Sequence, residues 1–255
     1  QRFYSGQQTV PPNVPSIVAV ADQATGEDTA KAIDFFVSHP ILHDGSINVT
    51  ATSDNTTLIP NEGLSLTNLG NGNWRLTATA AANLSGSALI TLTASDGTSS
   101  YAETFTLTVI AVNDAPIVDL DGGVSGTGYA ASFTEDGGPV AIVDAANLSL
   151  VDVDSTTLAG ATVTITNLLD GAAETLTANV AGTSLSAVYL NGVLTISGVG
   201  TVAEYQQVLR TVTYDNSSQA PSATARQIAF TVTDGAATSP AATSVVSIIP
   251  VNDAP

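Results

Sequence analysis

Short runs of oxygen-bearing side chains recur along this sequence at matching places. Val112-Asn113-Asp114-Ala115-Pro116 returns as Val251-Asn252-Asp253-Ala254-Pro255, and the acidic pair Glu27-Asp28 has a counterpart in Glu135-Asp136. Carboxylate, amide and backbone oxygens are the ligands of Ca²⁺, which takes about six to eight of them at a time. Clustered carboxylates repel one another unless a cation lies between them. The repeated motifs therefore favour calcium binding.

Two further acidic motifs lie between these repeats. Asp152-Val153-Asp154 places two carboxylates close together in the chain, and Ser95-Asp96-Gly97 is matched by Thr233-Asp234-Gly235. An Asp-Gly pair alone is typical of a hairpin turn, and an isolated Asp-x-Asp is weak evidence for a metal. It is the shared order of these motifs along the chain that favours a metal site over a set of unrelated turns.

The composition excludes several classes of protein. Of the 255 residues, 23 are acidic and 5 are basic, which gives a net charge of −18. Nucleic acid is not an expected partner, because binding it requires a basic face, and an anionic membrane would repel the chain. The chain contains no Cys, which excludes disulfides and thiolate metal sites. No run of about 18 apolar residues occurs, so we expect no membrane insertion.

Strands must position the acidic motifs. Apolar residues alternate with Thr or Ala over residues 104–109, 162–166 and 228–233. This period of two is typical of half-buried antiparallel strands. The many short strands, separated by Gly, Asn and Asp, indicate β-sandwiches rather than an α/β fold. Asn71-Gly72 predicts a tight hairpin turn between two of the strands.

Three other features have structural interpretations. Residues 201–209 are predicted to form one short helix, because Thr201 and Glu204 fit a capping box. We place the lone Trp74 in the core. His39 and His43 flank Pro40, so we interpret both as surface-loop residues, and two imidazoles without a third ligand make a poor zinc site.

The repeated boundary motif divides the chain into two units of unequal length. A degenerate copy of the motif occurs at Asn13-Val14-Pro15. We therefore expect a linker over residues 1–14, a first domain over 15–115 and a longer second domain over 116–255. At about 100–200 residues per domain, two domains fit the length. Because the chain ends on the boundary motif, we interpret it as a segment of a longer array.

Taken together, the motifs resemble the bacterial cadherin-like tandem repeats of large surface and secreted adhesins. The resemblance rests on the Asn-Asp-Ala-Pro ending, the Asp-Gly turns, the Glu-Asp pairs and Asp152-Val153-Asp154, and it covers most of residues 15–255. The second unit, with its segments 150–155 and 209–214, resembles the longer version of the repeat. The resemblance implies an all-β fold of two tandem Greek-key, immunoglobulin-like β-sandwich domains.

The resemblance also implies which residues hold Ca²⁺ at the junction of the two units. They come from the far end of the first domain, from the linker and from the near end of the second domain. This junction set is Glu27, Asp28, Asn113, Asp114, Asp152, Asp154 and Asp234. A weaker set lies at the outer ends of the two domains and consists of Glu135, Asp136, Asn252, Asp253 and Asp96.

The N-terminal end of the first unit departs from the family pattern. Ser38-His39-Pro40 stands where the family carries its Asp-x-Asp motif, and Val14 stands where the boundary motif carries Asp. Two ligands are therefore missing there. We expect any preceding junction not to be rigidified in the same way.

The expected function is structural. We expect a calcium-rigidified extender segment of a bacterial surface adhesin that acts in cell adhesion and biofilm formation, outside the cell or on its surface. It would contact neighbouring repeats of its own chain and remain a monomer. The alternative is a binding module for a cell-surface glycan or protein, and a third class is an accessory domain of an enzyme. Catalysis itself is not expected, because no Gly-x-Ser-x-Gly motif serves either His.

Overall fold

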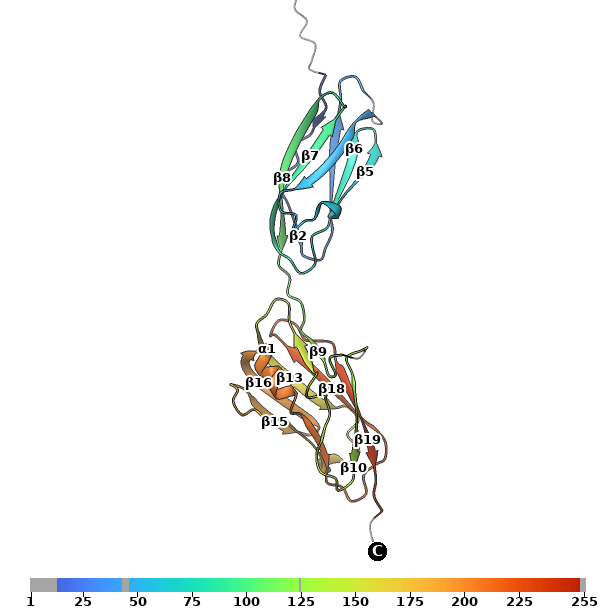
Figure 1. Cartoon of the computed structure of the whole chain (residues 1–255), viewed down its shortest axis with the longest axis vertical. Helices are drawn as coiled ribbons and strands as arrows, with labels where there is room; N and C mark the ends of the chain where they lie inside the picture. The colour runs from blue at the N-terminus through green and yellow to red at the C-terminus, as the bar shows by residue number, and fades with distance from the viewer. Residues whose placement is uncertain (1–12, 43–45, 124, 253–255) are drawn as a thin grey trace, which may run out of the picture. The chain divides into compact units, whose positions relative to one another are not determined.

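The computed structural model describes residues 13–42, 46–123 and 125–252 of the chain. It divides the chain into two compact units, Gln1–Val112 and Asn113–Pro255 (Figure 1). Both units are built almost wholly from β-strands arranged in packed sheets. The fold class is therefore all-β, with a β-sandwich in each unit, as the alternating pattern predicts.

Unit 1 is a sandwich of two four-stranded sheets. Their strand orders are β1-β3-β6-β5 and β2-β8-β7-β4. The strands are β1 (Ser16–Ile17), β2 (Gln23–Gly26), β3 (Lys31–Ser38), β4 (Asn48–Ser53), β5 (Leu64–Gly70), β6 (Asn73–Ala78), β7 (Gly86–Ser95) and β8 (Ser100–Ile110), with a 3-10 turn η2 (Asn61–Gly63) before β5.

Alternation along the strands builds the core of unit 1. Phe105, Leu107 and Val109 of β8 are buried between the sheets. The predicted hairpin is confirmed, because Asn71 and Gly72 join β5 to β6 with φ angles of 52° and 80°. Two successive residues in the left-handed region are what a tight type I′ turn needs. Trp74, expected in the core, packs against its border and is only partly buried.

Unit 2 contains a wider sheet. The strand orders are β10-β19-β18-β13-β16-β15, β11-β17-β14 and β12-β9. The strands are β9 (Ile117–Asp119), β10 (Tyr129–Thr134), β11 (Val140–Ala141), β12 (Ser149–Val151), β13 (Thr157–Ile165), β14 (Glu174–Thr177), β15 (Ser186–Leu190), β16 (Val193–Thr201), β17 (Thr213–Asn216), β18 (Arg226–Thr233) and β19 (Ala242–Ile249), with a 3-10 turn η3 (Gly171–Ala173) before β14.

The predicted helix is present as α1 (Val202–Leu209). Its capping box is complete, because the Thr201 side chain accepts from the backbone N–H of Glu204 while the Glu204 carboxylate accepts from the backbone N–H of Thr201. Tyr205, Val208 and Leu209 form its buried face. Among the described residues, no helix has the length and apolar character needed to cross a membrane.

An inserted segment makes unit 2 longer than unit 1. In unit 1 a two-residue turn joins β5 to β6, whereas β15, β16 and α1 separate the corresponding strands β14 and β17. Strand β16 pairs with β13, and β15 pairs with β16. The insertion therefore adds two strands to one sheet and makes β15 its edge (Figure 1).

Each unit also uses one parallel strand pair that the sequence pattern does not predict. The first strand of each unit pairs antiparallel in one sheet, as β1 with β3 and β9 with β12. The chain then crosses to the other sheet, where β2 pairs parallel with β8 and β10 pairs parallel with β19. This crossing brings the end of an early strand beside the end of the last strand.

Candidate calcium-binding ends of the two units

Each unit carries a buried Glu where its last strand ends. Glu27 directly follows β2, and its Oε1 accepts the backbone N–H of Val112 at 2.6 Å. Glu135 directly follows β10, and its Oε2 accepts the backbone N–H of Val251 at 2.7 Å. The two Glu residues are 5% and 3% exposed. The parallel strand pairs thus place each Glu beside the Val that begins a boundary motif.

The residue after each Glu has the same unusual backbone conformation. Asp28 and Asp136 have φ angles of 56° and 60°, in the left-handed region that Asp tolerates better than most residues. The Oδ1 of Asp28 accepts the backbone N–H of Asn83 at 3.1 Å. The Oδ1 of Asp136 accepts a side-chain N–H of Gln219 at 3.1 Å. The Glu-Asp pairs are therefore structurally equivalent features of the two units.

The first Asp of the Asp-x-Asp motif has one satisfied and one unsatisfied oxygen. Asp152 directly follows β12, and its Oδ1 accepts the backbone N–H groups of Asp154 and Ser155 at 3.0 and 2.8 Å. Its Oδ2 is buried and has no hydrogen-bond partner among the described residues. A buried carboxylate oxygen without a partner is costly. This oxygen therefore fits a cation, which would supply the missing partner.

The boundary residues of unit 2 lie against the same motif. The backbone N–H of Asp114 donates to Oδ2 of Asp154 at 2.6 Å. The side-chain amide of Asn113 donates to Oδ2 of Asp234 at 2.8 Å. Unit 2 thus joins four of the residues that the family resemblance assigns to calcium in two hydrogen-bonded pairs.

Asp234 is held as a charged carboxylate. Its Oδ1 accepts the backbone N–H groups of Ala236 and Ala237 at 2.6 and 2.7 Å. The Ala237 N–H first, and then the Asn113 amide, hold the pKa of Asp234 below its ordinary value of 3.8. The carboxylate is therefore negative at neutral pH, which is the state that binds a cation.

The proposed ligands are distributed over the two units. Glu27 and Asp28 belong to unit 1, whereas Asn113, Asp114, Asp152, Asp154 and Asp234 belong to unit 2. Among the described residues, no three acidic or His side chains are gathered closely enough to form a complete metal site.

The weaker set is only partly described. At the C-terminal end, Oε1 of Glu135 is buried without a hydrogen-bond partner among the described residues. Asn252 is exposed, and Asp253 lies outside the described residues. One carboxylate oxygen of Glu135 thus accepts a backbone hydrogen bond, and the other is available to another partner. The same is true of Asp152.

His39 lies in a loop as predicted, but its side chain is buried and not at the surface. Its side chain is 0% exposed and lies directly after β3. Its Nδ1 accepts the backbone N–H groups of Ile41 and Leu42 at 3.1 and 2.9 Å, so we assign the ring proton to Nε2. Nε2 lies 3.2 Å from Oδ2 of Asp96 and donates to it. His43 lies outside the described residues.

Asp96 occupies the same kind of turn as Asp234. Its Oδ1 accepts the backbone N–H groups of Thr98 and Ser99, both at 2.7 Å. These N–H groups, Ser99 first, hold the pKa of Asp96 below its ordinary value, and His39 adds to the effect. Both carboxylate oxygens of Asp96 therefore accept hydrogen bonds from residues of unit 1.

A buried ionic network in unit 2 also escaped the sequence analysis. Arg226 is fully buried, donates to Glu174, and reaches Oδ2 of Asp170 at 2.6 Å. Tyr214 donates to the same Glu174 carboxylate at 2.7 Å. A signal was present, because Arg226 is in phase with the inward residues of its strand, and an inward Arg requires carboxylate partners. The network fixes the loop that enters β18.

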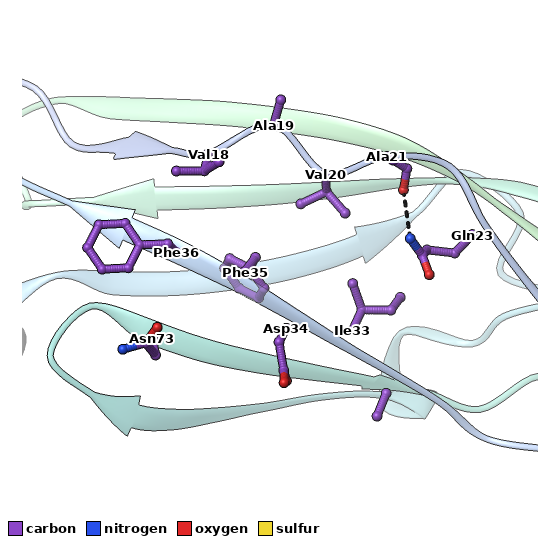
Figure 2. A pocket seen from close by; sticks show the side chains of 11 residues that line it. Val18, Ala19, Val20, Ala21, Gln23, Ile33, Asp34, Phe35, Phe36 and Asn73 are labelled. Carbon is purple, nitrogen blue, oxygen red and sulfur yellow. Dashed lines mark hydrogen bonds between the residues drawn. The ribbon is translucent and has the colours of Figure 1, made fainter.

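Unit 1 has a groove of ≈ 540 Å³ between β3 and the segment that joins β1 to β2. Figure 2 shows Val18, Ala19 and Val20 of this segment on one side and the β3 residues Asp34 and Phe36 on the other. Asp34 is the one charged residue that lines it, and both of its oxygens accept N–H groups of the Arg75 guanidinium, at 2.6 and 2.8 Å. The groove is thus lined by apolar side chains of several sizes together with Gln23, Asp34 and Asn73.

Neither a protein-family model nor a curated protein matches the sequence. Among solved structures, the chain is similar to the titin Z1Z2 domains in complex with telethonin, at 12% identity and a TM-score of 0.34, over 94% of this chain and 98% of that one. It is similar to the tandem Ig repeats of Dlar, at 12% identity and a TM-score of 0.31, over 92% of this chain and 98% of that one. An endo-fucoidan hydrolase of glycoside hydrolase family 107 matches at 15% identity and a TM-score of 0.35, but this chain spans only 30% of its length. At TM-scores of 0.31–0.35, these likenesses support no conclusion about activity or partners.

Proposed function

We propose that this chain is a calcium-rigidified structural extender segment of a large bacterial surface adhesin. The observation that supports it best is the buried, unpartnered Oδ2 of Asp152. It lies in the motif that also holds Asp154, which the boundary residue Asp114 contacts. An oxygen that no described residue satisfies, with a second Asp two residues further along the chain, is a suitable start for a Ca²⁺ ligand set.

In this proposal the residues of unit 2 form the larger part of the ligand set. Asp152 and Asp154 supply carboxylate oxygens from one loop, and Asp234 supplies a third carboxylate from the turn after β18. Glu27 would supply its second carboxylate oxygen from unit 1, since Oε1 is already used by Val112. A bound Ca²⁺ would neutralise these carboxylates and link ligands of both units through one ion.

Without the ion, hydrogen bonds within the chain partly offset the charge. The Asn113 amide donates to Asp234, and the Asp114 backbone donates to Asp154. Single N–H groups neutralise a carboxylate less completely than a divalent cation does, so repulsion among the three Asp residues remains. We therefore expect the linker to be less constrained in calcium-free solution and stiffer when calcium is present.

The proposed setting is outside the cell. Extracellular calcium-binding modules have dissociation constants of about 0.1–1 mM, which suits millimolar calcium. The net charge of −18 also fits a chain that remains dispersed at a crowded surface. Neighbouring repeats of the same chain are the expected partners, and Glu135 would play the role of Glu27 toward the next repeat.

Calorimetric titration with CaCl₂, followed by thermal unfolding in CaCl₂ and in EDTA, tests this proposal. We expect binding that raises the melting temperature, and loss of that response in Asp152→Asn. Asp144→Asn is the matched control, since Asp144 Oδ1 also accepts two backbone N–H groups but its Oδ2 is satisfied by Asn147 at 2.8 Å. The same calcium response in wild type and Asp152→Asn would contradict the assignment.

The groove in unit 1 supports the alternative of a binding module for a glycan or a protein. Its apolar side chains lie beside the polar groups of Gln23, Asp34 and Asn73, a combination that occurs at ligand sites. Val18 lines the groove and is exposed, so Val18→Trp would add bulk there (Figure 2). Loss of adhesion to target cells in this variant, with an unchanged calcium response, would favour the binding module over the extender.

A further inference from the structure

In each unit, an early strand runs parallel to the last strand and lies directly beside it. β2 pairs with β8 over four residues, from Gln23 with Leu107 to Gly26 with Ile110 (Figure 1). β10 pairs with β19 over six residues. Because the two strands of such a pair are parallel, the chain enters at one end of the pair and leaves at the opposite end. Tension applied through the chain would therefore slide the two strands past each other.

Sliding is the direction of force that a strand pair resists best. When the strands are pulled lengthwise in opposite directions, all of their hydrogen bonds carry the force together. When a strand is peeled from one end, the bonds break one after another. In unit 1, β1 adds little resistance, because two residue pairs hold it to β3. The β2–β8 ladder is therefore the part of unit 1 that opposes tension.

This short ladder is extended at both ends by carboxylates. At its start, Oδ1 of Asp22 accepts the backbone N–H of Thr106 at 2.7 Å. At its end, Oε1 of Glu27 accepts the backbone N–H of Val112 at 2.6 Å. A hydrogen bond to an ionised carboxylate is roughly twice as strong as one between neutral groups. Two side chains thus add a strong bond beyond each end of the four paired residues.

Unit 2 has a longer ladder with a carboxylate bond at one end. Oε2 of Glu135 accepts the backbone N–H of Val251 at 2.7 Å, where β10 and β19 end. The residue directly before β10 is Gly128, which has no side chain that could make a second bond. The additional carboxylate at the start of the ladder is thus found in the unit whose ladder is shorter.

We propose that Asp22 and Glu27 strengthen unit 1 against tension by acting as additional hydrogen-bond acceptors of the β2–β8 ladder. This inference rests on the proposed function, because an extender between a cell and its target must transmit force. It requires no metal ion, since both bonds form within the chain. The survival of a unit under force depends on its unfolding rate, and a bond that must break before the strands slide lowers that rate.

The chain offers a matched control for Asp22. Oδ1 of Asp54 accepts the backbone N–H of Leu89, also at 2.7 Å, and both Asp residues are exposed. The Asp54 bond likewise extends a ladder of unit 1, next to the pair Ser53 and Ile90 of β4 and β7. Neither β4 nor β7 is a terminal strand, so tension at the two ends of the unit does not slide them apart. Asp22 and Asp54 therefore make the same kind of bond in different positions relative to the force.

Single-molecule force-clamp unfolding of the whole chain in EDTA tests the proposal. Sliding of β2 from β8 frees residues 23–110 and adds about 300 Å of extended chain, whereas unit 2 frees residues 129–249 and adds about 400 Å. The two events can therefore be distinguished. We expect Asp22→Ala to shorten the lifetime of unit 1 at constant force about fivefold or more, and Asp54→Ala to change it less than about twofold. The lifetime of unit 2 should be the same in both variants.

Chemical unfolding of the same variants in EDTA separates position from bond strength. Asp22→Ala and Asp54→Ala should lose similar equilibrium stability, because each loses one bond of the same kind. An unchanged lifetime of unit 1 in Asp22→Ala would overturn the proposal. Equal shortening by both variants, or a shortening matched by a larger loss of equilibrium stability in Asp22→Ala, would also overturn it.

The two proposals fail in different measurements. Asp22 is not among the proposed calcium ligands, and EDTA removes the ion from the force experiment. Failure of the calcium proposal would appear in the calorimetric titration with CaCl₂, which Asp22→Ala should leave unchanged. Failure of the present inference would appear in the lifetime of unit 1 under force, whatever the titration shows.

Discussion

The two units have different residues at one equivalent position, the corner where the strand paired with the first strand of the unit ends. Ser38 ends β3 opposite Ser16, and Val151 ends β12 opposite Ile117, so His39 and Asp152 occupy the same position. Each side chain accepts two backbone N–H groups, from the residues two and three positions further along. The two residues therefore stabilise the same turn of the backbone in the loop that follows the strand.

The difference lies in the side-chain atom that remains. Nε2 of His39 donates to Asp96, so a neutral ring partners the carboxylate within unit 1. Oδ2 of Asp152 has no hydrogen-bond partner among the described residues. At one corner the hydrogen-bond donor is part of the chain. At the other corner no described residue supplies a donor, which is why our proposal places a cation there.

The largest expected effect comes from removing the carboxylates of unit 2. Asp152→Ala combined with Asp154→Ala should abolish most of the stabilisation by calcium, because the ion loses two ligands. That stabilisation is about 1.4 kcal/mol when free calcium exceeds the dissociation constant about tenfold. Chemical unfolding in CaCl₂ and in EDTA measures it, and an unchanged difference between the two would remove the assignment.

Placing the unit 2 residue type, Asp, at position 39 of unit 1 tests the comparison of the two corners more sharply. His39→Asp should destabilise unit 1 in EDTA by about 2 kcal/mol, since a carboxylate would replace the donor that faces Asp96. Added CaCl₂ should recover part of this loss. His39→Asn is the control, because its amide can both accept from the loop and donate to Asp96. If His39→Asp and His39→Asn behave alike in EDTA, the donor is not the feature that distinguishes the corners.

The buried Glu27 should matter even without calcium. Glu27→Ala removes the acceptor for the Val112 N–H, and we expect a loss of about 1.5 kcal/mol in EDTA. Glu27→Gln retains an oxygen acceptor and should lose less. Amide hydrogen exchange at Val112 provides the direct measurement. Equal exchange in wild type and Glu27→Ala would mean that the hydrogen bond does not hold the end of unit 1.

The smallest expected effect is on acid stability. The pKa values of Asp96 and Asp234 lie below the ordinary value of 3.8 in the folded protein. A lowered folded pKa contributes stability above the unfolded pKa, and this contribution is lost as the pH falls through the folded value. The melting temperature in EDTA should therefore decrease as the pH is lowered below about 4. The decrease should be smaller in Asp234→Asn. A variant with the full acid sensitivity of wild type would contradict this.

Much of the fold follows from local pattern. The alternation around Phe105 and around Phe230, the Asn71-Gly72 turn and the helix capped by Thr201 each depend on residues close together in the chain. Local rules are sufficient for such features, since the period of two fixes a face and two left-handed residues fix a tight turn. The parallel pairs β2–β8 and β10–β19 join residues far apart in the sequence, so no local pattern reports them.

The candidate site was predictable in its residue types but not in its hydrogen bonds. The repeated motifs identify Glu27 and Asp234, and the family resemblance adds Asp152. They do not indicate that Glu27 is buried against Val112, or that His39 replaces an Asp and points at Asp96. Each of those facts depends on which strand ends lie side by side, and that arrangement is set by the packing of the sandwich rather than by neighbouring residues.

Small-angle X-ray scattering of the chain in millimolar CaCl₂ and then in EDTA is the most direct test of the central claim. If calcium joins ligands of both units, the calcium form should have a narrow, well-defined distribution of distances, and the EDTA form should have a broader one. The Asp152→Ala, Asp154→Ala variant should show the broader distribution in both solutions. Identical profiles for the wild-type chain in CaCl₂ and EDTA would contradict calcium rigidification, and the acidic motifs would then be turns alone.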